Sequence, residues 1–209
     1  PAAIAAGVDA AARAGLLIRD FEAAERAASI RAIAFDKTGT LTEGKPKLVS
    51  TTAAPGFAAD DILRLAASAQ AGSEHPLAQA TVDAAGGKAQ PPESFEARPG
   101  QGLVAKVQGQ AIAIGSANLM AAEGIAVEML DAAVAKAGEG GCSIAFVAVD
   151  GALAGLLAFR DEPRAEAAAA IQAVRDAGLT PVMISGDNPA AVAVIAERLG
   201  ITDARAGVA

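Results

Sequence analysis

The chain has no tryptophan or tyrosine, one histidine and one cysteine among its 209 residues. A lone cysteine, Cys142, excludes a disulfide framework within the chain and fits a reducing compartment, so we expect it to be a small buried residue. Basic residues are also few: 17 Lys and Arg stand against 24 Asp and Glu, and the net charge of −7 argues against nucleic-acid binding. No run of 18 apolar residues is free of charge, so no membrane span is predicted.

Hydrophobic residues make up 53% of the chain, enough for one large domain or two small ones with cores. The most informative stretch is Asp-Lys-Thr-Gly-Thr-Leu-Thr at residues 36–42. We predict a buried strand over 29–35, and ligands of open α/β sheets bind at the carboxyl ends of strands. Backbone N–H groups of a tight turn can hold phosphoryl oxygens. Asp36 is therefore a candidate nucleophile that would carry an aspartyl-phosphate; the alternative is an Asp that caps a helix.

The last part of the chain repeats the order of strand, loop and helix. A second buried strand is predicted over 179–185, and a turn with Gly186 and Asp187 leads from it into another helix. The helix before this strand is expected to begin at Pro163, because proline is favoured at the first helical position. Asp187 and Asp36 would then lie at neighbouring strand ends and make one phosphate site.

About 110 residues of different character separate these two parts. Helices are predicted over 59–70 and 76–85, strands over 103–107 and 111–114, and a hairpin turn at Asp150-Gly151. The sequence therefore predicts a strand-rich insert with its own core, flanked by the two halves of one α/β unit.

The only histidine, His75, comes just before a helix whose first residue is proline. An imidazole there could contact an adenine ring or a phosphate, although for the residue taken alone a surface or helix-capping histidine is the favoured interpretation. Further along, Gly100 and Gly102 precede a strand and would allow a ligand to approach the backbone closely. A lone Gly-x-Gly pattern is weak evidence.

Four motifs together resemble the heavy-metal-transporting P-type ATPases of the P1B class. They are the heptapeptide at 36–42, Ser-Glu-His-Pro-Leu at 73–77, Gly-x-Gly at 100–102 and Ser-Gly-Asp-Asn at 185–188. The resemblance implies an α/β fold with a split haloacid-dehalogenase-like (Rossmannoid) phosphorylation domain, incomplete here. An α+β nucleotide-binding domain, an antiparallel sheet flanked by helices, would be inserted into it. The implied boundaries are 1–47, including a membrane-exit stub and hinge, then 48–158 for the insert and 159–209 for the second part.

In this family resemblance, Asp36 would accept the γ-phosphoryl group of ATP, and Ser185 would donate its hydroxyl to a phosphoryl oxygen. Mg²⁺ would be held by Asp36 and the backbone carbonyl of Thr38. Asp161 resembles the acid at the return hinge. The implied catalytic residues are Asp36, Lys37, Thr38, Ser185 and Asp187, and the phosphoryl loop also includes Gly39, Thr40 and Gly186.

The resemblance places His75 against the adenine ring. Two positions depart from the family pattern: Gln70 stands where a Glu is usual, five residues before His75, and Ser116 follows Gly115 where an Asn is usual. The implied nucleotide-binding residues are Gln70, Glu74, His75, Gly100, Gly102, Gly115 and Ser116.

Two further parts of the family pattern are absent: a Lys that neutralises the phosphoryl charge, and a Gly-Asp-Gly-x-Asn-Asp loop that holds Mg²⁺. The last lysine is Lys136, and no acid pair follows Glu197. Loss of one preorganised charge at such a site typically costs about 3–4 kcal/mol. We therefore expect a C-terminally truncated chain that binds nucleotide but is inactive alone; Arg205 as a substitute for the missing Lys is the less favoured alternative.

The leading hypothesis is the ATP-binding and phosphorylation headpiece of a metal-efflux ATPase, on the cytoplasmic side of a bacterial inner membrane. Cu(I) is the expected metal, bound by membrane helices outside the chain. One alternative is a non-catalytic nucleotide-binding module. Another is a soluble phosphatase with a cap domain, which Thr38 argues against, because phosphatases with a similar loop usually have a second Asp there as general acid and base.

Overall fold

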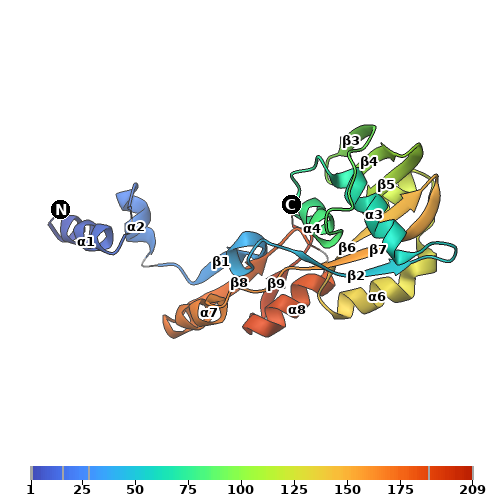
Figure 1. Ribbon diagram of the computed structural model, residues 1–209. Coiled ribbons are helices and arrows are strands. Elements are labelled where there is room, and N and C mark those ends of the chain that lie inside the picture. The colour runs from blue at the N-terminus through green and yellow to red at the C-terminus, as the bar shows by residue number, and fades with distance from the viewer. Residues whose placement is uncertain (1, 16, 28, 188, 209) are drawn as a thin grey trace.

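The computed structural model describes residues 2–15, 17–27, 29–187 and 189–208 (Figure 1). Asn188 of the 185–188 motif, and Pro1 and Leu16 of the expected membrane-exit stub, lie outside these residues. Two helices, α1 (Ala2–Arg13) and α2 (Phe21–Ala27), come first and extend away from the two sheets of the molecule. In the described part of the chain, no helix has both the length and the apolar character needed to cross a bilayer.

The first sheet has three parallel strands in the order β1 (Ala32–Asp36), β8 (Thr180–Ile184) and β9 (Asp203–Arg205). Helices α7 (Ala167–Asp176) and α8 (Pro189–Leu199) pack beside it. Ile171, Met183 and Ile195 lie at the centre of its core. We call this unit the parallel lobe.

The strand β1 differs from its prediction. It spans Ala32–Asp36 rather than 29–35, and its residues alternate between exposed and half-buried instead of being buried. The reason is its position: β1 forms the edge of the sheet, whereas β8 lies in the middle and buries Val182 and Met183. The second predicted strand, at 179–185, is confirmed by β8 as a buried strand.

The second sheet has six antiparallel strands. Gly151 and Asp150 both have positive φ (79° and 49°) at the turn between the strands Ser143–Val149 and Ala152–Arg160, which confirms the predicted hairpin. In spatial order the strands are β2 (Lys47–Ala53), β7 (Ala152–Arg160), β6 (Ser143–Val149), β5 (Gln110–Gly115), β4 (Gly102–Val107) and β3 (Ser94–Arg98).

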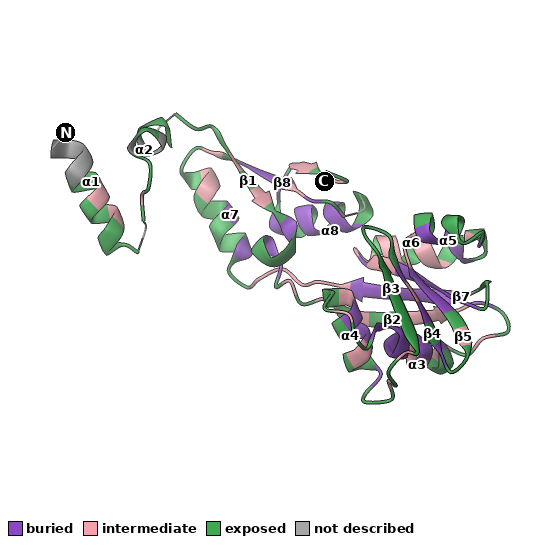
Figure 2. Cartoon of the chain, turned by 90° about the horizontal axis from the view of Figure 1, so that it is seen from above, coloured by how far each residue is buried: buried purple, intermediate pink, exposed green. Residues whose placement is uncertain are grey.

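Helices cover both faces of this sheet (Figure 2). On one face lie α3 (Ala59–Gln70) and α4 (Pro76–Ala84); on the other lie α5 (Ala117–Ala122), the 3₁₀ turn η2 (Glu128–Leu130) and α6 (Asp131–Glu139). Successive strand residues point to opposite faces, so Ile112 and Ile114 join the core under α3 while Ala113 joins the core under α5. We call this unit the antiparallel lobe.

The predicted helices at 59–70 and 76–85 are confirmed, the second ending one residue early. The predicted start of a helix at Pro163 is wrong, because α7 begins at Ala167. Instead Pro163 forms a β-bridge with Thr42, and the backbone N–H of Arg164 donates to the carbonyl of Leu41 at 2.9 Å. These tertiary contacts hold the segment extended against the outgoing chain.

The two lobes also touch away from their connecting segments. The end of α6 lies against α8, where a Cβ built on Gly141 would be only 2.8 Å from Cβ of Val194. A larger residue at 141 would push the lobes apart. Cys142, next in the chain, is buried as expected.

Candidate functional site

The loop after β1 begins at Asp36, the last residue of that strand. Residues 37–41 form a turn in which Thr38 (φ −79°, ψ 121°) and Gly39 (φ 77°) lie outside the helical region, and the φ of Gly39 favours glycine. The backbone N–H of Thr42 closes the turn by donating to the carbonyl of Lys37 at 3.0 Å. The heptapeptide thus forms a tight turn at a strand end, with Asp36 exposed at its start.

The second loop follows the neighbouring strand. Asp36 lies opposite Ile184 in the parallel register, so Ser185 and Asp187 come directly after the adjacent strand end. The hydroxyl of Ser185, a buried residue, accepts a hydrogen bond from the backbone N–H of Asp187 at 3.2 Å. An ion pair between Lys37 and Asp187 ties the two loops together. The two strand ends lie side by side, as the sequence predicts.

The orientation of Lys37 is the unexpected feature of this site. The residue is only 5% exposed, and its ammonium faces Asp187 instead of the open surface. Asp36, Thr38 and Thr40 are exposed. A ligand at this edge would therefore meet the aspartate and the backbone of the turn, while Lys37 holds the two loops in position.

Arg205 lies next to this edge on β9, opposite Ile184. Its guanidinium is already engaged by Asp203, with Nη2 at 3.1 Å from Oδ2. This hydrogen bond lowers the pKa of the Asp203 carboxyl. The arrangement gives no support to Arg205 as a substitute phosphoryl-binding cation.

Asp161, the acid that the family resemblance implies at the return hinge, links the outgoing and returning segments between the lobes, and we call these two segments the hinge. Its carboxylate accepts hydrogen bonds from the hydroxyl of Thr42 at 2.6 Å and from the backbone N–H groups of Gly44 and Lys45, each at 3.2 Å. Arg164, which the sequence did not single out, donates to the carbonyl of Gly39 at 3.1 Å. The hinge therefore contacts the turn that follows Asp36.

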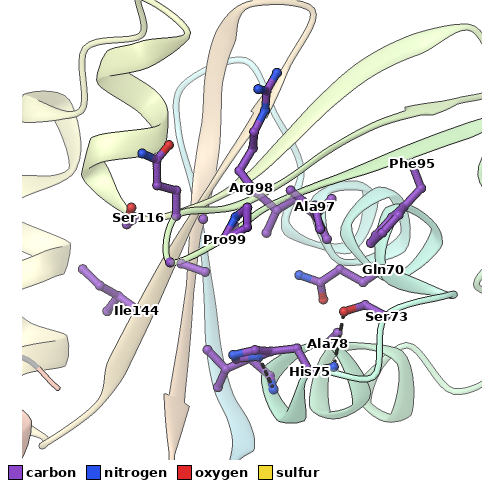
Figure 3. Close-up of a pocket in the computed structure, with 18 residues that line it drawn as sticks. Gln70, Ser73, His75, Ala78, Phe95, Ala97, Arg98, Pro99, Ser116 and Ile144 are labelled. Carbon is purple, nitrogen blue, oxygen red and sulfur yellow. Dashed lines mark hydrogen bonds between the residues drawn. The ribbon is translucent and has the colours of Figure 1, made fainter. Parts of the chain in front are cut away.

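A pocket of about 420 Å³ opens on the antiparallel lobe, within the size range of small-molecule sites (Figure 3). Six of the seven residues implied for nucleotide binding line it: Gln70, His75, Gly100, Gly102, Gly115 and Ser116. Glu74 is exposed and does not line it. Mostly apolar side chains complete its walls, from Leu77, Ala78, Phe95, Ala97, Pro99, Leu103, Ile114, Ile144 and Ala145.

His75 combines both interpretations that the sequence left open. It is the N-cap of α4, and its Nδ1 accepts a hydrogen bond from the backbone N–H of Leu77 at 3.2 Å. Because Nδ1 accepts, the neutral ring carries its proton on Nε2. The helix cap thus fixes the tautomer of a pocket residue and leaves an N–H donor for a ligand.

Gly102 and Gly115 line the pocket, but the close approach of two strands, and not that of a ligand, explains why they are glycines. They pair across β4 and β5, and a Cβ on Gly102 would lie 2.1 Å from the carbonyl oxygen of Ile114. Their small size is therefore required by the close approach of two strands. Gly100, with a φ of 71° and no atom near its Cβ position, borders open space. Ser116 caps α5, its hydroxyl accepting from the N–H of Leu119 at 3.4 Å.

The strand β3, and the pocket wall that it provides, were not predicted from the sequence. Phe95 and Ala97 alternate there with Glu96 and Arg98, a period of two that is typical of a strand. All five residues of β3 are exposed, so the strand lacks the strong apolar pattern of a buried one. The alternation was the one available signal.

Comparison with known proteins shows which family the chain belongs to. A family model described as haloacid dehalogenase-like hydrolase matches residues 30–209. A copper-transporting P-type ATPase of Rhizobium leguminosarum bv. viciae is 42% identical over 197 residues, which cover 93% of this chain and 23% of the relative. The chain thus spans about a quarter of the length of the curated relatives that it matches.

Solved structures agree. A zinc-transporting PIB-type ATPase in the E2.Pi state matches with a TM-score of 0.69 and 36% identity, covering 100% of this chain and 34% of the other. The catalytic CPx-ATPase domain CopB-B matches with a TM-score of 0.71 over 97% of this chain and 70% of its own, although at 23% identity it supports the fold alone. The expected fold class is confirmed. The chain belongs to the haloacid dehalogenase-like hydrolase family, and its homologues are heavy-metal-transporting P-type ATPases of the P1B class.

Proposed function

We propose that this chain is the ATP-binding and phosphorylation headpiece of a metal-translocating P-type ATPase, with Asp36 as the residue that is phosphorylated. One observation carries the proposal: Asp36 is exposed at the end of β1, where the Lys37–Asp187 ion pair joins the loop after β1 to the loop after β8. A carboxylate at the carboxyl ends of parallel strands, next to a buried serine hydroxyl, suits the attack on a phosphoryl group.

The proposed domains follow the two sheets to within two residues at each boundary. Residues 48–158 form a nucleotide-binding domain, which carries the pocket, while residues 1–47 and 159–209 form the phosphorylation domain. That residues 1–18 lead from a membrane helix, and that the headpiece faces the cytoplasm, are further parts of this proposal.

In the proposed step, a carboxylate oxygen of Asp36 attacks the γ-phosphorus of ATP. The bond between that phosphorus and the oxygen bridging it to the β-phosphate breaks, and ADP leaves with the electron pair. No proton needs to move. The hydroxyl of Ser185 and the backbone of the turn at 37–41 supply hydrogen bonds to the transferred group.

Magnesium fits the donors present at this edge. Mg²⁺ is usually held by one or two carboxylates together with the phosphates of its substrate. The carboxylate of Asp36 and the carbonyl of Thr38 are hard oxygen donors of this kind. No cluster of three acidic, His or Cys side chains exists in the described ranges, so the phosphates of ATP would have to complete the ligand set. An ion bound there with ATP would offset the negative charge of the phosphates.

The pocket and Asp36 belong to different lobes, so the proposed transfer requires the lobes to approach each other. The segments that connect them are bound by Asp161 through three hydrogen bonds and by Arg164 through one to Gly39. We propose that this hinge guides the antiparallel lobe as it delivers the γ-phosphate.

Cu(I) is the proposed cargo. The identity of 42% with a copper-transporting relative supports copper, whereas a zinc/cadmium/lead-transporting relative is 38% identical, the same value as two other copper-transporting relatives. In such a pump the side chains that bind the transported metal decide its identity through the softness of their donor atoms.

Acid-stable labelling with [γ-³²P]ATP and Mg²⁺ tests the proposal. The family resemblance implies a later Lys and an acidic loop, so the assay uses this chain and a version continued through both. We expect a hydroxylamine-sensitive label, weak in the chain itself and strong in the longer version, that Asp36→Asn abolishes in both. Asp60→Asn, an exposed substitution in the antiparallel lobe, is the matched control and should retain the label.

Label that survives Asp36→Asn would place the nucleophile elsewhere. ATP binding without label in either version would favour the alternative of a non-catalytic nucleotide-binding module. That alternative has one observation in its favour, since the pocket lies entirely within the antiparallel lobe. Rapid turnover of small phosphate esters would instead indicate a phosphatase, despite Thr38.

A further inference from the structure

The turn at residues 138–142 joins α6 to β6 and touches the parallel lobe outside the hinge segments. A Cβ built on Gly138 would lie 3.4 Å from Cβ of Ala190. One built on Gly141 would lie 2.8 Å from Cβ of Val194. Ala190 and Val194 are four residues apart on α8 and share one face of that helix. The two lobes therefore meet here in close packing, and Figures 1 and 2 show α6 beside α8.

Arg160 ties the same turn to the hinge. It is the last residue of β7, directly before Asp161, and its Nε donates a hydrogen bond to the carbonyl of Gly140 at 3.1 Å. A Cβ on Gly140 would lie 3.0 Å from Nη2 of Arg160, so the guanidinium is packed against the turn. The turn thus stays within the reach of one side chain from the point where the returning segment begins.

This position determines how far the turn moves when the lobes move. The hinge segments are joined by the Thr42–Pro163 bridge and by a hydrogen bond from the backbone N–H of Glu43 to the carbonyl of Glu162 at 3.0 Å, so a rotation of the lobes is centred near them. In a rotation, each point is displaced in proportion to its distance from the axis. The turn lies next to the hinge, whereas the pocket extends to β3, four strands away from β7. The pocket therefore sweeps while the turn hardly moves.

The residues in the contact also allow a rotation. Two glycine positions meet the short side chains of Ala190 and Val194, and the atoms that face each other are carbons. Packed surfaces of this kind can slide by small amounts, because no long side chain has to disengage. The contact can therefore stay closed during a rotation of the antiparallel lobe.

The helix that the turn touches also carries part of the reaction site. The loop at 185–187 leads into α8, and Asp187 in this loop is paired with Lys37. Ala190 comes only three residues after Asp187. A lobe that bears on this end of α8 is therefore positioned directly against the element that holds one side of the site.

We infer that the turn at 138–142 is a pivot. It stays against α8 while the antiparallel lobe rotates about the line from this contact to the hinge, and the rotation brings the pocket to Asp36. Two points of support leave two rigid bodies one rotation, so the approach of the lobes has a single path. The inference rests on the proposed function and adds how the lobes are guided.

A crosslink across the contact tests the pivot. The Cβ separation of 3.4 Å between positions 138 and 190 is close to the spacing in a disulfide, about 3.5–4.5 Å. Gly138→Cys with Ala190→Cys, combined with Cys142→Ser and placed in the longer version used for labelling, should therefore crosslink on oxidation, which peptide mapping verifies. A bond on the axis does not stop a rotation. We expect the oxidised protein to keep its MgATP affinity and its Asp36 label within about twofold of the reduced protein.

A charge placed in the contact should have the opposite effect. Val194→Asp sets a carboxylate against the turn, and the carboxylate keeps its water only if the lobes separate. The rate of label formation should fall by about tenfold or more, because the pocket and Asp36 lose their alignment. ATP affinity should not change, since Val194 does not line the pocket. Ala193→Asp, at the adjacent exposed position of α8, is the matched control and should change neither quantity.

The other outcomes each overturn a different statement. Loss of label on oxidation, with ATP bound as before, would show that the contact must open and is no pivot. Equal label in Val194→Asp and Ala193→Asp would show that the contact guides nothing, and a cysteine pair that does not crosslink would show that the lobes do not keep it.

Absence of label from the unmodified longer version would instead overturn the proposed function. The rate of crosslinking with and without MgATP then decides the pivot. Equal rates support it, and a rate that falls when MgATP is added would show that the contact opens.

Discussion

The two lobes of the molecule differ in how completely helices cover their sheets. The six-stranded antiparallel sheet has helices on both faces and two buried cores. The three-stranded parallel sheet has one core, and its edge strand β1 has no fully buried residue. The pocket thus stands on an enclosed framework, whereas Asp36 stands on an exposed edge.

This difference shows how each site obtains its geometry. Packing fixes most of the pocket, because twelve of its eighteen lining residues belong to strands and helices of the antiparallel lobe. At the edge of the parallel lobe, pairing fixes the site instead: the Lys37–Asp187 ion pair joins the loops, and Arg164 holds the turn at Gly39. The proposed binding site therefore rests on packed elements, whereas the proposed reaction site depends on a few polar contacts.

The largest expected difference is in core packing. Ile62 on α3 has no exposed surface, so Ile62→Ala should lower the free energy of unfolding by about 2–5 kcal/mol. Ile33 on β1 is half-buried, and Ile33→Ala should cost about half as much or less. Urea denaturation followed by circular dichroism measures both. Equal losses would show that β1 is as well packed as the antiparallel lobe and would remove the contrast.

The second prediction concerns the strand pair beneath the pocket. A Cβ on Gly115 would lie 2.0 Å from the carbonyl oxygen of Gln101, a backbone atom that cannot move aside as a side chain could. Gly115→Ala should therefore cost about 1–3 kcal/mol of stability and weaken ATP binding by displacing the pocket wall. Gly72→Ala is the matched control, since nothing lies near its Cβ position and its φ is not positive. Equal effects at the two positions would contradict the packing argument.

Much of the enclosed lobe could be predicted from sequence, because local patterns determine its elements. The helix at 59–70 has acidic residues in its first turn and a clear apolar face, and its bounds are confirmed. The hairpin at 150–151 follows from the Asp-Gly pair. By contrast, every residue of β3 is exposed, and the strand was missed, since no apolar run distinguishes it from a loop.

The exposed edge was harder to predict in detail. The adjacency of Asp36 and Asp187 follows from the rule that the carboxyl ends of parallel strands meet. The inward direction of Lys37 does not, because the same lysine could equally face a phosphate, and only the tertiary contact with Asp187 decides. The false helix start at Pro163 has the same cause, since contacts with Thr42 and Leu41 outweigh the local preference.

A third prediction separates the two roles of His75. Both His75→Gln and His75→Asn remove the imidazole Nε2–H from the pocket, so each should weaken ATP binding by about tenfold. Asn is a good N-cap residue and Gln is not, so only His75→Gln should also lose about 0.5–1 kcal/mol of stability.

Calorimetry and thermal unfolding measure the two effects of these substitutions at His75. Unchanged ATP affinity in both variants would show that the ring serves the helix alone. In that case α4 would contribute less to nucleotide binding than the structure indicates. The contrast between the pocket, which packing fixes, and the Asp36 site, which polar contacts fix, would then weaken.

A small effect on stability is also expected at the hinge, and it bears most directly on the comparison between the lobes. Asp161→Asn keeps one acceptor oxygen but loses the charge and part of the three hydrogen bonds, which should cost about 1 kcal/mol. ATP affinity should stay unchanged, because Asp161 does not line the pocket. Phosphorylation of Asp36 in the extended version should fall, since the hinge holds the turn through Thr42. A loss of ATP affinity equal to the loss of label would mean that the hinge shapes the pocket too, and that the lobes do not work as separate units.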